Sequence, residues 1–219
     1  MSHEHHQEVV KRLDSWLEHI NYHVIRDDIP DREEDAVVNP SLIYIDNVPS
    51  RYHKLFTVIC TAFHEVNGAQ IRLVFRKIPM TMQARPDIWA LLMGRRRYVV
   101  LINTSPQHNG ITIDDIPFNG QLGIIAHEMS HILDYEHKSL WGLIKTGIDY
   151  ISRTKRAQYE KAIDLLAVRK GFGLQMHTWA RFVLEEANVT ERYRQTKQRY
   201  YLDTAAIKWA WDQMSAVLD

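Results

Sequence analysis

Hydrophobic positions in the first half of the chain follow two different periods. Apolar residues three and four positions apart predict a helix within residues 1–24 and a second helix over 55–66. Between them, residues 27–39 are acidic and bounded by prolines, so we expect an exposed connection there. Runs rich in β-branched and aromatic residues predict three short strands, over residues 42–45, 71–75 and 98–103.

The second half of the chain keeps the helical period from Asn119 to the end, with interruptions at glycines. Strands confined to the first half and helices to the second indicate an α+β fold, because a parallel sheet would require the two to alternate. A chain of 219 residues is long enough to bury a self-sufficient core, and we expect one domain over residues 1–219.

The composition excludes several classes of protein. The apolar share of 45% and the charged share of 25% are those of a globular chain. Because 27 Lys and Arg balance 27 Asp and Glu, we expect no nucleic-acid partner. We also expect no transmembrane segment, since no apolar run approaches the roughly 20 residues that cross a bilayer. A single cysteine, Cys60, and a first segment without the apolar core of a signal peptide favour the cytoplasm.

Residues 127–131 read His-Glu-Met-Ser-His, which is an H-E-x-x-H motif. Positions four apart lie on one face of a helix, so His127 and His131 can direct their rings to one metal ion, with Glu128 beside it. A chance match has an expectation of about 0.04 in a chain of this composition. Apolar residues flank the motif at helical spacing, so the sequence predicts a zinc site on a helix.

A catalytic zinc ion normally takes a third protein ligand, and Glu160 is the strongest candidate. Glu160 and Asp164 are four residues apart in a further predicted helix with several apolar positions, so both carboxylates share one face. A buried carboxylate needs a partner, and a metal ion for one and an imidazole N–H for the other would satisfy both. The alternative is that both lie on a solvated face, paired with Lys161 or Arg156.

From Asn119 to Gly171 the chain resembles the zincin metallopeptidases of the gluzincin type, in which a helix bearing E-x-x-x-D follows the H-E-x-x-H helix. The resemblance implies Zn²⁺ bound by His127, His131 and Glu160. It also implies that Glu128 is the general base and that Asp164 orients a ligating histidine.

The same resemblance implies a small mixed sheet packed on the active-site helix, with an edge strand that holds an extended peptide. Residues 98–103, the last predicted strand before the motif, resemble that edge strand. The alternative for this strand is an ordinary place inside the sheet.

His137 is a rival third ligand, because it lies where the metzincin pattern H-E-x-x-H-x-x-G-x-x-H has its last histidine. This chain has Asp134 in place of the glycine that allows the chain to turn back toward the metal. A helix that continues through Asp134 would carry His137 away from the site.

These residues lead to the expectation of a zinc-dependent metallopeptidase that acts on a peptide or protein substrate. The alternative is a zincin-fold binding or structural zinc module without turnover. Donors to a transition-state oxyanion are not selected by spacing; the candidates are His177, Tyr193, Tyr200 and Tyr201.

Overall fold

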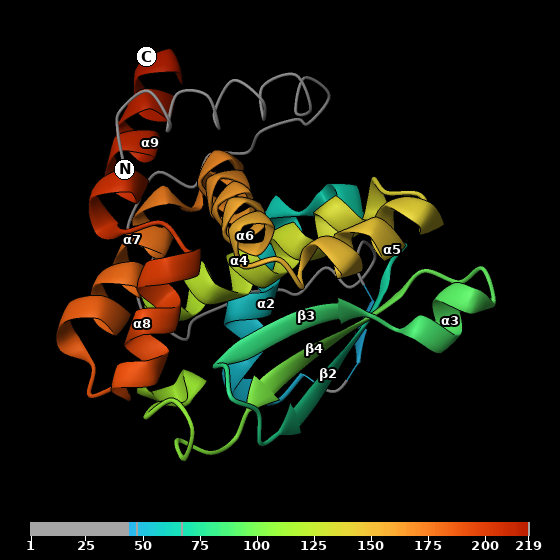
Figure 1. The fold of residues 1–219 in the computed structure, drawn as a ribbon, viewed down its shortest axis with the longest axis horizontal. Helices are drawn as coiled ribbons and strands as arrows, with labels where there is room; N and C mark the ends of the chain where they lie inside the picture. The colour runs from blue at the N-terminus through green and yellow to red at the C-terminus, as the bar shows by residue number, and fades with distance from the viewer. Residues whose placement is uncertain (1–43, 47, 67, 219) are drawn as a thin grey trace.

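The computed structural model describes residues 44–46, 48–66 and 68–218, so the helix expected within 1–24 and the connection expected at 27–39 lie outside the described residues. Figure 1 shows a small sheet on one side and a larger group of helices around and beside it. The strands are β1 (Tyr44–Asp46), β2 (Gln70–Arg76), β3 (Met82–Pro86) and β4 (Arg97–Asn103). The helices are α2 (His53–Ala62), α3 (Ile88–Leu92), α4 (Phe118–Glu136), α5 (Leu140–Asp149), α6 (Arg153–Ala167), α7 (Gly173–Arg181), α8 (Glu191–Tyr200) and α9 (Thr204–Leu218).

The strands form one mixed sheet in the order β1-β2-β4-β3. β1, β2 and β4 run parallel to one another, and β3 runs antiparallel to β4. In β2, Ile71 and Leu73 are buried while Gln70 and Arg72 are exposed, which is the period of two that the sequence shows. The strands predicted at 71–75 and 98–103 are thus confirmed, and the run at 42–45 overlaps β1.

The strand beside the H-E-x-x-H helix is β3 and not the strand at residues 98–103. That strand, β4, pairs with β2 on one side and β3 on the other, so its resemblance to an edge strand is wrong and the alternative of an interior strand is right. β3 is not among the strands predicted from the sequence. Its residues alternate between buried Met82 and Ala84 and exposed Gln83 and Arg85, but alanine and a proline weaken the β signal.

α4 is the central helix of the fold. It packs against β3, α6 and α7, and every residue from Leu122 to Tyr135 is buried. Figure 1 shows α4 between the sheet and α6. A helix buried on all sides has no solvated face for its polar residues, so each polar side chain in this stretch requires a partner inside the protein.

Gly123 allows α4 and α7 to approach closely. A Cβ atom at this position would lie 2.3 Å from the backbone oxygen of Gln175 and 2.6 Å from its carbonyl carbon. Backbone atoms of a packed helix cannot move away as a flexible side chain can, so only glycine fits at this crossing. Gly147 of α5 is different, because a Cβ there would meet no atom within 4 Å.

The structure is an α+β fold, with β1–β4 before residue 104 and helices from Phe118 onward. The expected division between a sheet-bearing half and a helical half is therefore confirmed. Within the residues described, none of the helices has the length and apolar character needed to cross a bilayer.

Replacement by alanine is predicted to have opposite effects at Gly123 and at Gly147. Gly123→Ala should lower the free energy of unfolding by about 3 kcal/mol or more, because it forces two helix backbones apart. Gly147→Ala should raise it by about 0.5–1 kcal/mol, because alanine restricts the unfolded chain and favours the helix. Urea unfolding of the two variants beside the wild type measures both values, and equal effects would contradict the close approach of α4 to α7.

Candidate metal centre

His127 and His131 lie one turn apart on α4 and leave the same face of the helix. Their Nε2 atoms are 3.1 Å apart, and their rings are nearly perpendicular. Both side chains are buried. Two imidazole nitrogens therefore point to one place in the interior, as the spacing in the sequence predicts.

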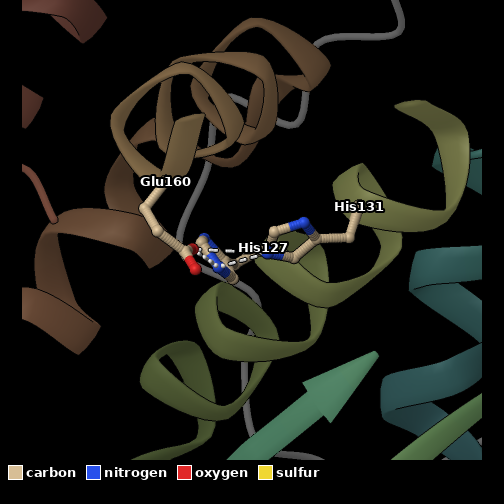
Figure 2. A group of neighbouring side chains, drawn as sticks. All are labelled: His127, His131 and Glu160. Atoms are coloured by element: carbon tan, nitrogen blue, oxygen red, sulfur yellow. Dashed lines mark hydrogen bonds and ion pairs between the residues drawn. The ribbon is translucent and has the colours of Figure 1, made fainter. Parts of the chain in front are cut away.

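Glu160 of α6 points to the same place (Figure 2). Its Oε2 atom lies 3.3 Å from Nε2 of His127 and 3.4 Å from Nε2 of His131. Glu160 is only 1% exposed, and Oε2 receives no conventional hydrogen bond. The fold thus brings together His127 and His131 of the H-E-x-x-H motif and Glu160 of the E-x-x-x-D motif.

The separations of these three atoms fit a bound metal ion. Ligands held about 2.0–2.1 Å from a tetrahedral zinc ion are about 3.3 Å from one another, because that is the edge of the corresponding tetrahedron. The three measured separations are 3.1, 3.3 and 3.4 Å. The buried group of His127, His131 and Glu160 can hold a metal ion.

Asp164 holds the ring of His127. Its Oδ1 atom is 2.8 Å from Nδ1 of His127, and its Oδ2 atom accepts a hydrogen bond of 2.8 Å from the backbone N–H of Leu202. A carboxylate beside Nδ1 keeps the proton on that nitrogen and leaves a lone pair on Nε2. The expected role of Asp164 as the partner of a ligating histidine agrees with this contact.

A second chain of polar groups orients His131. Its Nδ1 atom lies 3.4 Å from the hydroxyl oxygen of Tyr159, which donates a hydrogen bond of 2.6 Å to Asp134. Lys138 forms an ion pair of 2.5 Å with the same carboxylate. Because the Tyr159 proton goes to Asp134, its oxygen can accept from Nδ1, and the lone pair of Nε2 again faces the site.

Glu160 is fixed by Tyr150, whose hydroxyl donates to Oε1. This contact leaves Oε2 as the oxygen that faces the two histidines. Tyr150 and Tyr159 were not found by sequence reasoning. Neither has a spacing relative to the motif that carries meaning; Tyr159 is placed here by the packing of α6 on α4, and Tyr150 by its contact with Glu160 at the end of α5.

The ionisation of these groups indicates a strongly negative environment. Burial disfavours a charged imidazole, but the hydrogen bond to Asp164 and the nearby carboxylate of Glu160 outweigh burial and raise the pKa of His127 to about 10. Burial also disfavours a charged carboxylate, yet the two facing imidazoles hold the pKa of Glu160 well below its usual range. Burial and then the charges of Glu160 and Glu128 raise the pKa of Tyr201 well above its ordinary value. A positive charge is therefore stabilised at this place.

Glu128 lies beside the group without belonging to it. One of its oxygens, Oε2, accepts a hydrogen bond of 2.5 Å from the backbone N–H of Ala84 in β3. The other oxygen has no hydrogen-bond partner in the part of the chain that the structure describes. A cavity of about 290 Å³ opens over the site; its wall includes His127, Glu128, His131 and Glu160, together with β3, part of α5, Arg156 and Tyr201.

The structure does not bring His137 to the site. α4 continues through Asp134 to Glu136, and His137 is the residue that ends it. Its Nδ1 atom lies 2.8 Å from the backbone oxygen of Leu133, and the residue is exposed. The sharp turn that the metzincin pattern needs is absent because the residue at that place is an aspartate in a continuous helix.

Of the four candidate oxyanion donors, only Tyr201 reaches the cavity, where its ring lies 5.3 Å from that of His127. The Tyr193 hydroxyl is hydrogen-bonded to Thr81 at 2.8 Å. Tyr200 and His177 do not line this cavity.

Comparison of the chain with models of protein families, with curated proteins and with solved structures found no match.

The third ligand is predicted to be Glu160. Glu160→Ala should weaken zinc binding by more than about 100-fold, because it removes one of three converging atoms. His137→Ala should leave the affinity unchanged, since that ring faces away. Titration against a chromophoric chelator, with metal analysis of each protein, measures both. Loss of zinc in His137→Ala with retention in Glu160→Ala would reverse the assignment.

Asp164 is predicted to act through His127. Asp164→Asn should weaken zinc binding by about 10- to 100-fold, because a neutral amide no longer fixes the proton on Nδ1 of His127. The amide oxygen can still accept from Leu202, so the fold should be retained. Chelator competition together with circular dichroism separates the two effects, and unchanged affinity would show that the contact with His127 has no influence on the metal.

Proposed function

We propose that the protein is a zinc-dependent hydrolase of peptide bonds, of the zincin type and with the gluzincin arrangement of ligands. The observation that carries the proposal is the convergence of three lone-pair atoms, from His127, His131 and Glu160, beside a further carboxylate in an accessible cavity. A structural metal site uses four protein ligands and is closed, whereas a catalytic site uses three and leaves one position for a water or substrate.

The donor set supports zinc as the metal. Two imidazole nitrogens and one carboxylate oxygen form one of the ligand sets found in catalytic zinc sites. Without a cation, the two Nε2 atoms and the Glu160 oxygen would place three lone pairs against one another in a buried site. Bound zinc would polarise a carbonyl group and lower the pKa of a water molecule to about 7.

Glu128 is the group that supports hydrolysis rather than binding alone. The Ala84 N–H fixes one carboxylate oxygen, so the other oxygen is held in the cavity wall. Held in this way, the second oxygen of Glu128 accepts a proton from the attacking water. The carboxyl group later delivers this proton to the leaving amine. A catalytically silent module would have no use for a carboxylate in this position.

β3 supports a peptide as the substrate. Thr81 and Asp87 form backbone hydrogen bonds with β4, so the alternate residues Met82, Ala84 and Pro86 direct their backbone groups away from β4. Residues Met82–Pro86 also line the cavity. An extended chain beside this edge can pair with the carbonyl groups of β3 while its own carbonyl lies near the metal ligands.

Glu128→Gln provides the central test. The amide oxygen can still accept from Ala84, so fold and zinc content should be retained, whereas turnover should fall by at least about 100- to 10,000-fold because an amide cannot accept the proton. Cleavage of a peptide library and metal content are measured in the same preparation.

Glu136→Gln is the matched control. Glu136 lies on the same helix, but its carboxylate accepts from Tyr98 and does not line the cavity. The Glu136→Gln variant should cleave the peptide library at the wild-type rate. Equal cleavage by Glu128→Gln and wild type would exclude Glu128 as the base. If the zinc-loaded wild type cleaves none of the peptides, the binding module is favoured. If metal analysis of the purified protein finds iron instead of zinc, the assignment of the metal is overturned.

A further inference from the structure

The cavity over the metal centre contains a cation that the proposed mechanism does not use. Arg156, in the first turn of α6, lines this cavity together with His127, His131, Glu128 and Glu160. It is one turn before Glu160 on the same helix, so the guanidinium and the metal ligand lie on the same side of α6. Any substrate in the cavity therefore lies near both.

Arg156 has no acidic partner among the residues that the structure describes. Its Nε atom is buried and lacks a hydrogen-bond acceptor. Neighbouring lysines differ in this respect: Lys138 pairs with Asp134, and Lys145 and Lys155 both pair with Asp149. Glu160, the residue one turn further along α6, faces the histidines instead.

Two aromatic rings hold the guanidinium in place. Its Cζ atom lies 4.4 Å from the centre of the Tyr200 ring and 5.0 Å from that of the Tyr150 ring. Contacts with ring faces fix the orientation of an arginine but do not use its N–H donors. A guanidinium held in this way keeps a planar pair of donors for a carboxylate.

Tyr150 lies between Arg156 and the metal ligands. Its ring contacts Arg156 and its hydroxyl donates to Glu160, so the guanidinium and the ligands are one tyrosine side chain apart. Because only one tyrosine side chain lies between them, we take the separation to be about one or two residues of an extended peptide, at about 3.4 Å per residue. The first turn of α6 contains no acidic residue, although a helix N-terminus favours negative charge.

We propose that Arg156 binds a carboxylate of the substrate one or two residues from the scissile bond, so that the protein selects acidic peptides. This inference rests on the proposed function for the identity of the reaction, but the binding itself does not require zinc. The carboxylate comes either from an Asp or Glu side chain or from the C-terminus of a short peptide, and both present the same planar pair of oxygens to the guanidinium.

The test measures binding to zinc-free protein, in which a carboxylate cannot be captured by the metal. The probes are three N-acetylated peptides: Ala-Ala-Ala with a free C-terminus, Ala-Glu-Ala with an amidated C-terminus, and Ala-Gln-Ala with an amidated C-terminus as the neutral reference. NMR titration of the wild type should show at least one acidic peptide binding about 10- to 100-fold more tightly than the reference. The peptide with the higher affinity identifies the source of the carboxylate.

Three variants assign the effect to Arg156. Arg156→Met should reduce acidic peptides to the affinity of the reference, and Arg156→Lys should retain part of the preference because it keeps the charge without the planar donors. Arg153→Gln, an exposed position on the same turn, should bind as wild type does. If Arg156→Met does not fold, Arg156→Lys beside Arg153→Gln decides the question.

Activity of the zinc-loaded protein separates this inference from the proposed function. Cleavage with KM raised about 10- to 100-fold in Arg156→Met and little change in kcat would support both. Preferential binding of acidic peptides without cleavage would support the role of Arg156 and remove the peptidase. Cleavage without any preference, or no measurable binding of the acidic peptides, would overturn the role of Arg156.

Discussion

The structure depends on one electrostatic constraint. The lone-pair atoms of His127, His131 and Glu160 are buried together between α4 and α6, and the buried carboxylate of Glu128 lies beside them. Burying a carboxylate such as Glu160 without a partner is costly, and its Oε2 atom receives no hydrogen bond although it faces the two histidines. The raised pKa of His127 and the lowered pKa of Glu160 both indicate that a positive charge is needed there. A proton can supply that charge, and a metal ion held by His127, His131 and Glu160 could supply it to all three atoms at once.

The surrounding packing serves to hold these groups in fixed orientations. Asp164, Tyr159 and Tyr150 each contact a different member of the group, so no ligand depends on the metal alone for its position. Asp164 and Tyr159 come from α6, which packs on α4, and Tyr150 comes from the end of α5. Gly123, on the α7 side of α4, allows the close helix contact that supports this arrangement from behind.

Charge is unevenly distributed in a chain whose overall balance is neutral. The carboxylates of Glu128 and Glu160 line the cavity and are buried, and the buried Asp164 lies behind His127. Arg156 lines the same cavity, held by tyrosine rings and without a carboxylate partner among the described residues. This arrangement would favour a cation beside His127, His131 and Glu160 and an anion beside Arg156, with Tyr150 in contact with both Glu160 and Arg156.

Several parts of the protein follow from local spacing along the chain. His127 and His131 converge because residues four apart share a helix face, and Glu160 and Asp164 do so for the same reason on a second helix. The α+β division and two of the strands also follow from periodicity. The identity of the strand beside α4 does not follow from local spacing, because β3 has a weak local signal and acquires its place by pairing with β4. The contacts of Tyr150 with Glu160 and of Tyr159 with His131 and Asp134 likewise arise only in the folded protein, since they join different helices.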